Sequence, residues 1–166
     1  MTCRLRRVIS GGQTGVDRIA LERAREAGLE IGGWCPPRRA AEDGVIPHEL
    51  PLRETPRERS EQAPHVARSL RTEWNVRDAD GTLLLAPRGL IDPGCDWTRE
   101  CARLHSRPLL ELDPLGPKGA AALRHWLEEH SIVVLNVAGP SLRSAPEHAD
   151  AASRLLAIVF GHGFIG

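Results

Sequence analysis

Short apolar runs alternate along this chain with longer stretches in which apolar residues recur every three or four positions. The runs at 83–85 and 132–135 are typical of strands that are covered on both faces. In the first helical stretch, Val16, Ala20 and Ala24 fall on one face. The pattern predicts strands over 5–10, 30–35, 82–85, 108–112 and 132–137, and helices over 14–28, 65–77, 96–106, 118–130 and 144–160.

Five strands separated by helices predict an α/β protein with a mainly parallel five-stranded sheet and helices on both faces. We expect one domain over 1–166. The polar segment 36–64 exceeds ordinary loop lengths, so we expect it to be functional or partly disordered, with a helix start of its own at Thr55. Ser144 and Glu147 have the spacing of a capping box at the start of the last helix.

Composition excludes several classes of partner. Lysine plus arginine and aspartate plus glutamate both number 22, so the formal net charge is zero and gives no reason to expect a nucleic-acid partner. No apolar run approaches the roughly 20 residues that span a bilayer. The four cysteines form no Cys-x-x-Cys pair and have no histidine at zinc spacing, so we expect no metal site. We therefore expect a cytoplasmic protein with reduced thiols.

The joint between the first strand and the first helix is rich in glycine. Gly11, Gly12 and Gly15 let the backbone turn sharply and approach a ligand closely. Free N–H groups at the helix start favour an anion, and Thr14 with Asp17 has capping-box spacing. The joint therefore predicts a site for a phosphate-like or oxyanionic group, although a tight turn that binds nothing explains the same residues.

A second joint of this kind begins at Pro93. Gly94, Cys95 and Thr98 follow a predicted strand and open a helix. In a doubly wound sheet, ligands lie beyond the carboxyl ends of the strands, where the winding reverses. If the two glycine joints converge there, the first and third strands are neighbours, and the expected strand order is 2-1-3-4-5. The alternative is that Pro93 and Gly94 merely turn the chain.

Arginine supplies nearly all of the positive charge, and guanidinium groups can bind oxyanions bidentately. The pool of cations that could reach an anion comprises Arg18, Arg38, Arg39 and Arg71. The adjacent Arg38 and Arg39 also fit a solvated charge run, which binds no ligand.

A carboxylate beside a bound phosphate can act as a general base, and Asp17 and Glu73 are the candidates for that role. In the same segment as Glu73, we expect Trp74 to pack in the core rather than to line a pocket. The chain contains no Gly-x-Ser-x-Gly elbow, no Walker lysine and no His-Glu-x-x-His, so no such motif assigns a reaction.

Six motifs occur in an order that resembles one protein family. They are SGGQTGVDR at 10–18, GGWCP at 32–36, RAAEDG at 39–44, LRETP at 52–56, RTEWNV at 71–76 and LNVAGP at 135–140. Together they resemble the molybdenum carrier family, the circularly permuted YpsA-like branch of the SLOG superfamily, over about residues 7–160. That superfamily also includes lysine-decarboxylase-like LOG proteins and DprA-type proteins.

The resemblance implies a Rossmann-like doubly wound sheet, a homo-oligomer such as a dimer or tetramer, and a small phosphate-bearing or oxyanionic ligand. The ligand would be the molybdenum cofactor, molybdate or a nucleotide derivative. A DNA- or partner-binding module, like the DprA relatives, is a further class, against which the zero net charge counts. The residues expected to bind the ligand are Gly11, Gly12, Gln13, Thr14, Gly15, Arg18, Arg39, Arg71, Gly94, Cys95 and Thr98.

The family resemblance also bears on catalysis. LOG-type phosphoribohydrolases carry Pro-Gly-Gly-x-Gly-Thr-x-x-Glu, of which this chain keeps Pro93, Gly94 and Thr98. Cys101 stands where the catalytic glutamate would be, and Glu100 comes one residue early, about 100° away around the helix. We therefore expect a binding protein; the alternative is a hydrolase that acts on a nucleotide-derived substrate.

Overall fold

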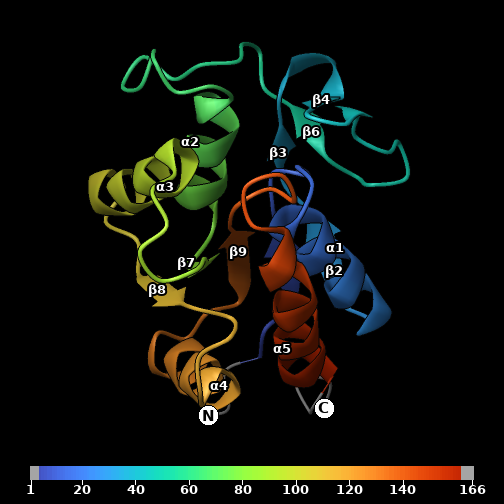
Figure 1. Ribbon diagram of the computed structural model, residues 1–166, viewed down its shortest axis with the longest axis vertical. Helices are drawn as coiled ribbons and strands as arrows, with labels where there is room; N and C mark the ends of the chain where they lie inside the picture. Colours follow the sequence, from blue (N-terminus) through green and yellow to red (C-terminus); the bar gives the residue numbers. More distant parts are fainter. Residues whose placement is uncertain (1–3, 162–166) are drawn as a thin grey trace.

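The computed structural model describes residues 4–161, which form a five-stranded parallel sheet flanked by helices (Figure 1). The strands of this sheet are β1 (Arg7–Ile9), β2 (Glu30–Gly32), β7 (Gly81–Leu85), β8 (Leu109–Leu112) and β9 (Val134–Ala138). The helices are α1 (Val16–Glu26), α2 (Ser69–Asp78), α3 (Pro93–Leu104), α4 (Gly119–Glu129) and α5 (Ala149–Gly161). The predicted fold class is confirmed.

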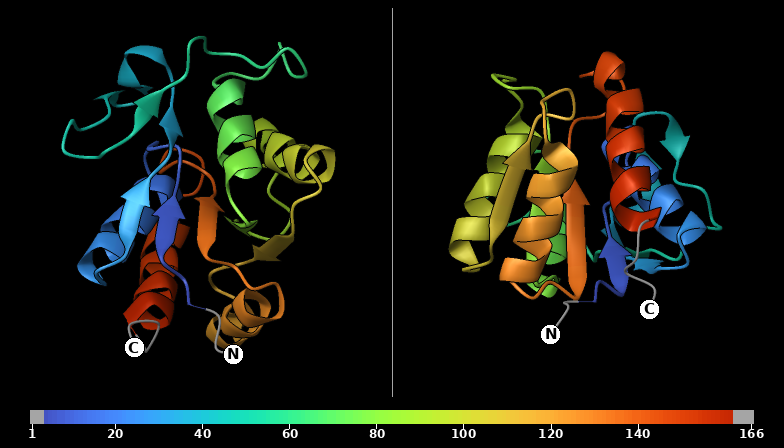
Figure 2. Two further views of the ribbon diagram at one scale, coloured as in Figure 1. Left: turned by 180° about the vertical axis from the view of Figure 1, so that it is seen from behind. Right: turned by 90° about the horizontal axis from the view of Figure 1, so that it is seen from below.

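Helices cover both faces of the sheet. α1, α4 and α5 pack on one face, over a core that contains the fully buried Val8, Leu83 and Leu135. α2 and α3 pack on the other face, where Trp97 and Cys101 belong to a second apolar cluster. Seen from behind, β2, β1 and β9 lie in front of α1 and α5 (Figure 2). The chain therefore builds three layers, with apolar side chains on both sides of the central strands.

The predicted strand order is wrong. The sheet has the order β2-β1-β9-β7-β8, so the last strand of the chain lies between the first and third predicted strands. Leu135 pairs with Val8 on one side and with Gly81 on the other. Leu135 and Val137 are fully buried, as a central strand requires. After β2 the chain crosses to β7 and leaves room for one strand between β1 and β7, which β9 later fills. The lengths of the connecting segments do not reveal this gap.

Two predicted capping boxes are also wrong. α1 begins after Gly15, which has a φ of 81° and no side-chain cap, so Thr14 does not cap this helix. The last helix begins at Ala149, after a short 3₁₀ turn η2 (Pro146–His148) that also has no side-chain cap. α3, by contrast, begins earlier than predicted, because Asp92 accepts a hydrogen bond from the Cys95 N–H at 2.8 Å.

The polar segment 36–64 is folded, and much of it lies beyond the carboxyl ends of β1 and β2 (Figure 1). The predicted strand 30–35 breaks at Gly33, whose φ is 128°. The following short strand β3 (Trp34–Cys35) leaves the main sheet and pairs with β6 (Arg53–Glu54), while β4 (Ala40–Ala41) and β5 (Gly44–Val45) form a hairpin. The expected helix at Thr55 does not form, because its hydroxyl closes a local turn onto the Arg57 carbonyl.

Arg39 holds this segment together from inside. Arg39 is the last residue of the 3₁₀ turn η1 (Pro37–Arg39), and it is only 9% exposed. Its guanidinium donates hydrogen bonds at 2.8–3.2 Å to the carbonyls of Ile46, Pro47, Leu50 and Leu52. This side chain is therefore a structural anchor rather than a ligand for an external anion, contrary to the sequence-based expectation.

We predict that Arg39→Ala lowers the free energy of unfolding by about 2–4 kcal/mol, because buried carbonyls lose their donor. Arg38→Ala is the matched control, since Arg38 is exposed and has nearly the same backbone conformation, with φ 58° against 55°. It should change the free energy by no more than about 0.5 kcal/mol. Urea denaturation of the three proteins measures both effects, and equal losses in the two variants would contradict the role of Arg39.

Candidate functional site

A pocket of about 230 Å³ opens beyond the carboxyl ends of β1, β9 and β7. Its wall combines the loop after β1, the beginnings of α2 and α3, and the loop after β9. The two glycine joints therefore do converge, although their strands are not adjacent. Only β9 separates β1 from β7, which places the two outer strands about 10 Å apart. The pocket lies where parallel α/β sheets bind ligands.

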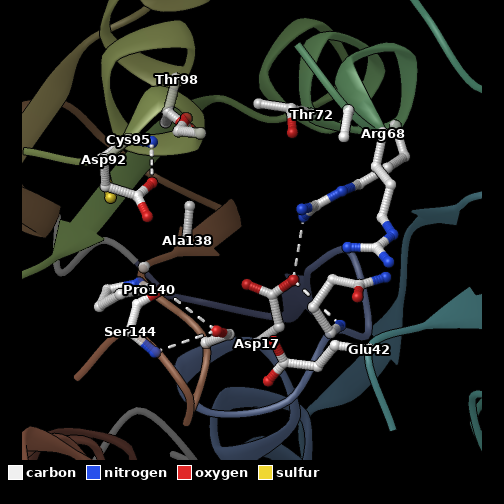
Figure 3. A pocket seen from close by; sticks show the side chains of 16 residues that line it. Asp17, Glu42, Arg68, Thr72, Asp92, Cys95, Thr98, Ala138, Pro140 and Ser144 are labelled. Carbon is white, nitrogen blue, oxygen red and sulfur yellow. Dashed lines mark hydrogen bonds and ion pairs between the residues drawn. The ribbon is translucent and has the colours of Figure 1, made fainter. Parts of the chain in front are cut away.

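The centre of the pocket is a buried ion pair (Figure 3). Asp17, on α1, is 2% exposed, and its Oδ2 accepts hydrogen bonds from Arg71 Nη1 at 3.0 Å and from the Gln13 N–H at 3.2 Å. Burial raises the pKa of the Asp17 carboxyl, and the Arg71 cation, the Gln13 N–H and Ser10 offset part of that rise. A buried carboxyl with a raised pKa beside a cation is typical of functional sites.

Gly11 makes room for this pair. A Cβ at position 11 would lie 2.2 Å from Arg71 Nη1 and 2.9 Å from Asp17 Oδ2, closer than real atoms approach. Gly11 therefore lets the guanidinium of α2 lie against the backbone that follows β1. Gly11 was expected to bind the ligand, whereas its role in the structure is to make room for the side chain of Arg71.

Two buried polar atoms at this site lack partners within residues 4–161. They are Arg71 Nε and Gln13 Oε1. The amide of Gln13 cannot simply turn over, because its Nε2 donates to the Ala40 carbonyl at 2.9 Å. Gln13 is 6% exposed and lines the pocket. Both residues line the pocket, and the described part of the protein leaves this acceptor and this donor without a partner.

The start of α3 forms the opposite wall, with Asp92, Cys95 and Thr98 across from Asp17 (Figure 3). Thr98 donates its hydroxyl to the Gly94 carbonyl at 2.9 Å. Burial and the nearby Asp92 raise the pKa of the Cys95 thiol to about 12. Cys95 is therefore a neutral thiol at physiological pH, and residues 4–161 contain no group of three side chains that could hold a metal ion.

A carboxylate from the long polar segment also enters the pocket. Glu42, at the turn of the β4–β5 hairpin, accepts a hydrogen bond from the Thr14 hydroxyl, and that hydroxyl accepts one from the Leu142 N–H at 3.3 Å. Burial raises the pKa of Glu42, but hydrogen bonds from Thr14, Ser141 and the Arg143 N–H together bring it below its ordinary value. Glu42 is therefore ionised, and Thr14 is engaged by the protein itself.

Several predicted site residues serve other contacts. Arg18 pairs with Asp43 at 2.6 Å and donates to the Gly12 carbonyl at 2.9 Å. Gly12, with a φ of 76°, faces the core side chains of Leu52 and Ile46. Gly15 is the helix cap, where a Cβ would lie 2.7 Å from the Pro140 carbonyl oxygen. Substituting these glycines would thus disturb the fold.

Glu73 lies apart from the pocket. Its carboxylate accepts a hydrogen bond from the Ser60 hydroxyl. The same carboxylate pairs with His105 Nε2 at 3.2 Å. Trp74 is half-buried rather than part of the core, since it packs edge-on against Trp34 with ring centroids 4.8 Å apart. Of the two candidate bases, the structure therefore brings only Asp17 into the pocket.

Sequence reasoning missed six polar side chains of the pocket wall. Asp92 had a signal, since an N-cap acid directly before a proline is typical of a helix start. Glu42 stood in a recognised motif without a role. Thr72 also stood in a recognised motif, and Ser144 was expected only to cap the last helix. Arg68 and Ser141 gave no local signal, because they reach the pocket only through packing between distant segments.

The comparison with protein families identifies the chain. The model of the circularly permutated YpsA SLOG family matches residues 8–160. The chain belongs to this family. A crystal structure named "Putative molybdenum carrier protein", from Syntrophus aciditrophicus SB, is 36% identical, with a TM-score of 0.84, and the match covers 96% of this chain and 97% of that one.

Two further comparisons give negative results. None of the curated proteins matches this chain. Within residues 4–161, no helix is both long and apolar enough to cross a bilayer.

We predict that Arg71→Gln raises the pKa of Asp17 further, because the variant removes the strongest interaction that opposes burial. Carboxyl-carbon NMR titration measures this pKa directly. The matched control is Arg25→Gln on the exposed end of α1, which should leave the pKa unchanged. An unchanged or lower pKa in Arg71→Gln would contradict the assignment.

The same raised pKa predicts a pH dependence of stability. An unfolded aspartate ionises near pH 3.9, before the folded one does. Asp17 therefore lowers the stability of the folded protein as pH rises from the unfolded-state pKa through the folded-state pKa. Thermal denaturation across this range should show that loss in the wild type and not in Asp17→Asn.

Proposed function

We propose that this protein binds a small molecule that carries a phosphate or another oxyanion, and that it acts as a carrier of the molybdenum cofactor or molybdate, or as a sensor of a nucleotide derivative. The family membership and the printed name of the Syntrophus aciditrophicus protein support this proposal. We further propose that it works as a homo-oligomer, as the family resemblance implies, and in the cytoplasm, as the composition of the chain favours.

One observation carries the proposal: two residues from separate segments, each with a buried polar atom that lacks a partner among the described residues, line one pocket. Gln13 Oε1 is an acceptor and Arg71 Nε is a donor, and neither has a partner among residues 4–161. A buried polar atom without a hydrogen bond costs about 1–3 kcal/mol. A ligand that brings an N–H or O–H group together with an anionic group would satisfy both atoms.

The charges of the pocket favour such a ligand over a bare oxyanion. Arg68 and Arg71 contribute positive charge, but Asp17, Glu42 and Asp92 face the same space. Carboxylates attract the amino and ring N–H groups of a pterin or a nucleobase, while the arginines attract a phosphate. The molybdenum cofactor and nucleotides both combine these two features. We therefore place the molybdenum cofactor or a nucleotide derivative ahead of molybdate alone.

The size of the pocket agrees with a small ligand. Typical ligand pockets have about 300–1,000 Å³, so about 230 Å³ accommodates one end of such a molecule, and the rest extends through the open mouth. Residues 4–161 contain no group of three His, Cys, Asp or Glu side chains that could hold a metal ion. The proposed contacts are therefore hydrogen bonds and ion pairs to the organic part and the phosphate.

Hydrolysis of a nucleotide-derived substrate is the second candidate. Asp17 favours it, because a buried carboxyl with a raised pKa could act as a general base. Against it, Cys101 is fully buried in an apolar cluster, and its burial raises the pKa of the thiol. Glu100 instead pairs with Arg103 on the outside of α3. No carboxylate takes the place of the glutamate that LOG-type enzymes use on this helix.

Binding is tested by calorimetry with phosphate, molybdate and adenosine monophosphate. Arg68→Gln should weaken binding of the phosphate-bearing ligands about tenfold, because a charge-assisted hydrogen bond contributes roughly 1.5–3 kcal/mol. Arg25→Gln removes the same charge from an exposed position on α1 and should leave affinity unchanged. Equal affinity in all three proteins would contradict the proposed site.

Native mass spectrometry of protein purified from its own host complements this titration. The mass retained by the protein would identify the ligand, and the assembly mass would give the number of subunits. Protein that carries no additional mass and binds none of these ligands would contradict the carrier proposal.

Hydrolysis is tested by a time course with adenosine monophosphate and chromatography of the products. We expect no catalytic release of the base. Multiple turnovers that disappear in Asp17→Asn but persist in Glu73→Gln would overturn the carrier proposal in favour of the hydrolase. Glu73→Gln is the matched control, because Glu73 lies apart from the pocket beside Ser60 and His105.

A further inference from the structure

The β4–β5 hairpin lies along one side of the pocket and is attached to the α1 joint by polar contacts. Gln13 Nε2 donates to the Ala40 carbonyl, the Thr14 hydroxyl donates to Glu42, and Arg18 pairs with Asp43. The Arg18–Asp43 pair is on the surface, with Asp43 46% exposed. The pair is bidentate, with N–O distances of 2.6 and 2.9 Å, but its carboxylate is open to water, which limits its contribution to stability.

Both ends of the hairpin are anchored by buried side chains. Arg39 lies before it with four hydrogen bonds to backbone carbonyls, and the fully buried Ile46 follows it. Between them, Val45 is 58% exposed, and a Cβ at Gly44 would meet no atom within 4 Å. The turn that carries Glu42 can therefore move about its anchored ends without uncovering a large apolar surface.

The carboxylate of Glu42 lies among groups that suit an oxyanion. The Thr14 hydroxyl donates to it, and Ser141 and the Arg143 N–H, from the loop after β9, help to lower its pKa. Ser141 lines the pocket together with Glu42 and with Gln13, the residue before Thr14. A phosphate oxygen can accept the same hydrogen bonds as a carboxylate oxygen.

An anionic ligand and Glu42 cannot both use this position. The pocket already contains Asp17 and Asp92 as further carboxylates against the two guanidinium groups of Arg68 and Arg71. A phosphate beside an ionised Glu42 would add like-charge repulsion at hydrogen-bonding distance. Departure of Glu42 would remove one negative charge and free its donors at the same time.

We propose that Glu42 occupies the oxyanion subsite of the pocket in the free protein, and that the phosphate or oxyanion of the ligand takes its place as the β4–β5 hairpin swings outward. This inference rests on the proposed function, since it concerns the same pocket. It assigns the donors around Thr14 and the loop 141–143 to the anionic end of the ligand. It also makes Glu42 a competitor, supplied by the chain itself, that weakens binding of free anions.

Calorimetry with inorganic phosphate tests the proposal on the wild type, Glu42→Gln and Glu49→Gln. Glutamine keeps the size of the side chain but removes its charge, so Glu42→Gln should bind phosphate at least about tenfold more tightly. Glu49 lies in the same polar segment and is exposed, so Glu49→Gln should behave as the wild type. Unchanged or weaker binding in Glu42→Gln overturns the proposal.

Hydrogen exchange of the wild-type protein provides a readout that does not depend on a variant. Saturating phosphate should increase exchange of backbone amides over 40–46, where the hairpin opens, and slow it near 13–18. Slower exchange over both segments overturns the proposal, because the hairpin would then close over the ligand.

These titrations separate the two proposals. Equal tight binding of phosphate by the wild type and Glu42→Gln removes only the role of Glu42. Absence of binding by every protein contradicts the proposed function, and the displacement of Glu42 with it. Parallel titrations with molybdate and adenosine monophosphate distinguish a free oxyanion from a phosphate ester, and both should gain affinity in Glu42→Gln.

Discussion

The buried ion pair between Asp17 and Arg71 determines how the layers of this protein meet at the site. Asp17 lies on α1, which covers one face of the sheet, and Arg71 lies on α2, which covers the other. The pair therefore joins both outer layers around the carboxyl end of β1. It can form only because Gly11 leaves room for the guanidinium. A side chain at this position would separate the two charges and leave a buried carboxylate without its cation.

Such a pair is expensive to bury, and its stabilising effect is seldom larger than the cost of removing both charges from water. Its position beside a pocket gives it another role, because it fixes where a guanidinium points. Arg71 uses Nη1 for Asp17 and keeps Nε unpaired. The orientation of Gln13 is fixed in a similar way by the Ala40 carbonyl. The polar groups of the pocket are thus positioned before any ligand arrives, which lowers the entropic cost of binding.

The strands and the fold class could be predicted from the sequence because burial on both faces leaves a local trace, namely continuous apolar runs such as 83–85. The strand order could not, because β9 enters a central position that depends on pairing between residues far apart, such as Val8 with Leu135. The convergence of the two glycine joints was predicted correctly for a partly wrong reason. Parallel strands place their carboxyl ends at one edge of the sheet even when another strand lies between them.

The arginines show most clearly where sequence reasoning ends. Arg39 and Arg71 both stand in motifs of the family, and both were predicted to bind the ligand. Arg39 instead binds four carbonyls of a chain segment that returns past it after residue 45, an arrangement without any local pattern. A motif therefore predicts that a residue is needed, whereas only the fold distinguishes an anchor from a ligand-binding group.

The balance of charge in the pocket has a consequence for selectivity. A pocket lined only by arginines would hold any phosphate in the cell, whereas this one sets Arg68 and Arg71 against Asp17 and Asp92, and an anion must also displace Glu42. An anion alone meets repulsion there, and only a molecule that also offers hydrogen-bond donors satisfies both sets of groups. Discrimination through unfavourable contacts with the wrong ligand is a general route to specificity. The repulsion between the carboxylates and an anion also keeps the affinity for the ligand moderate. Moderate affinity suits a protein that must release its ligand.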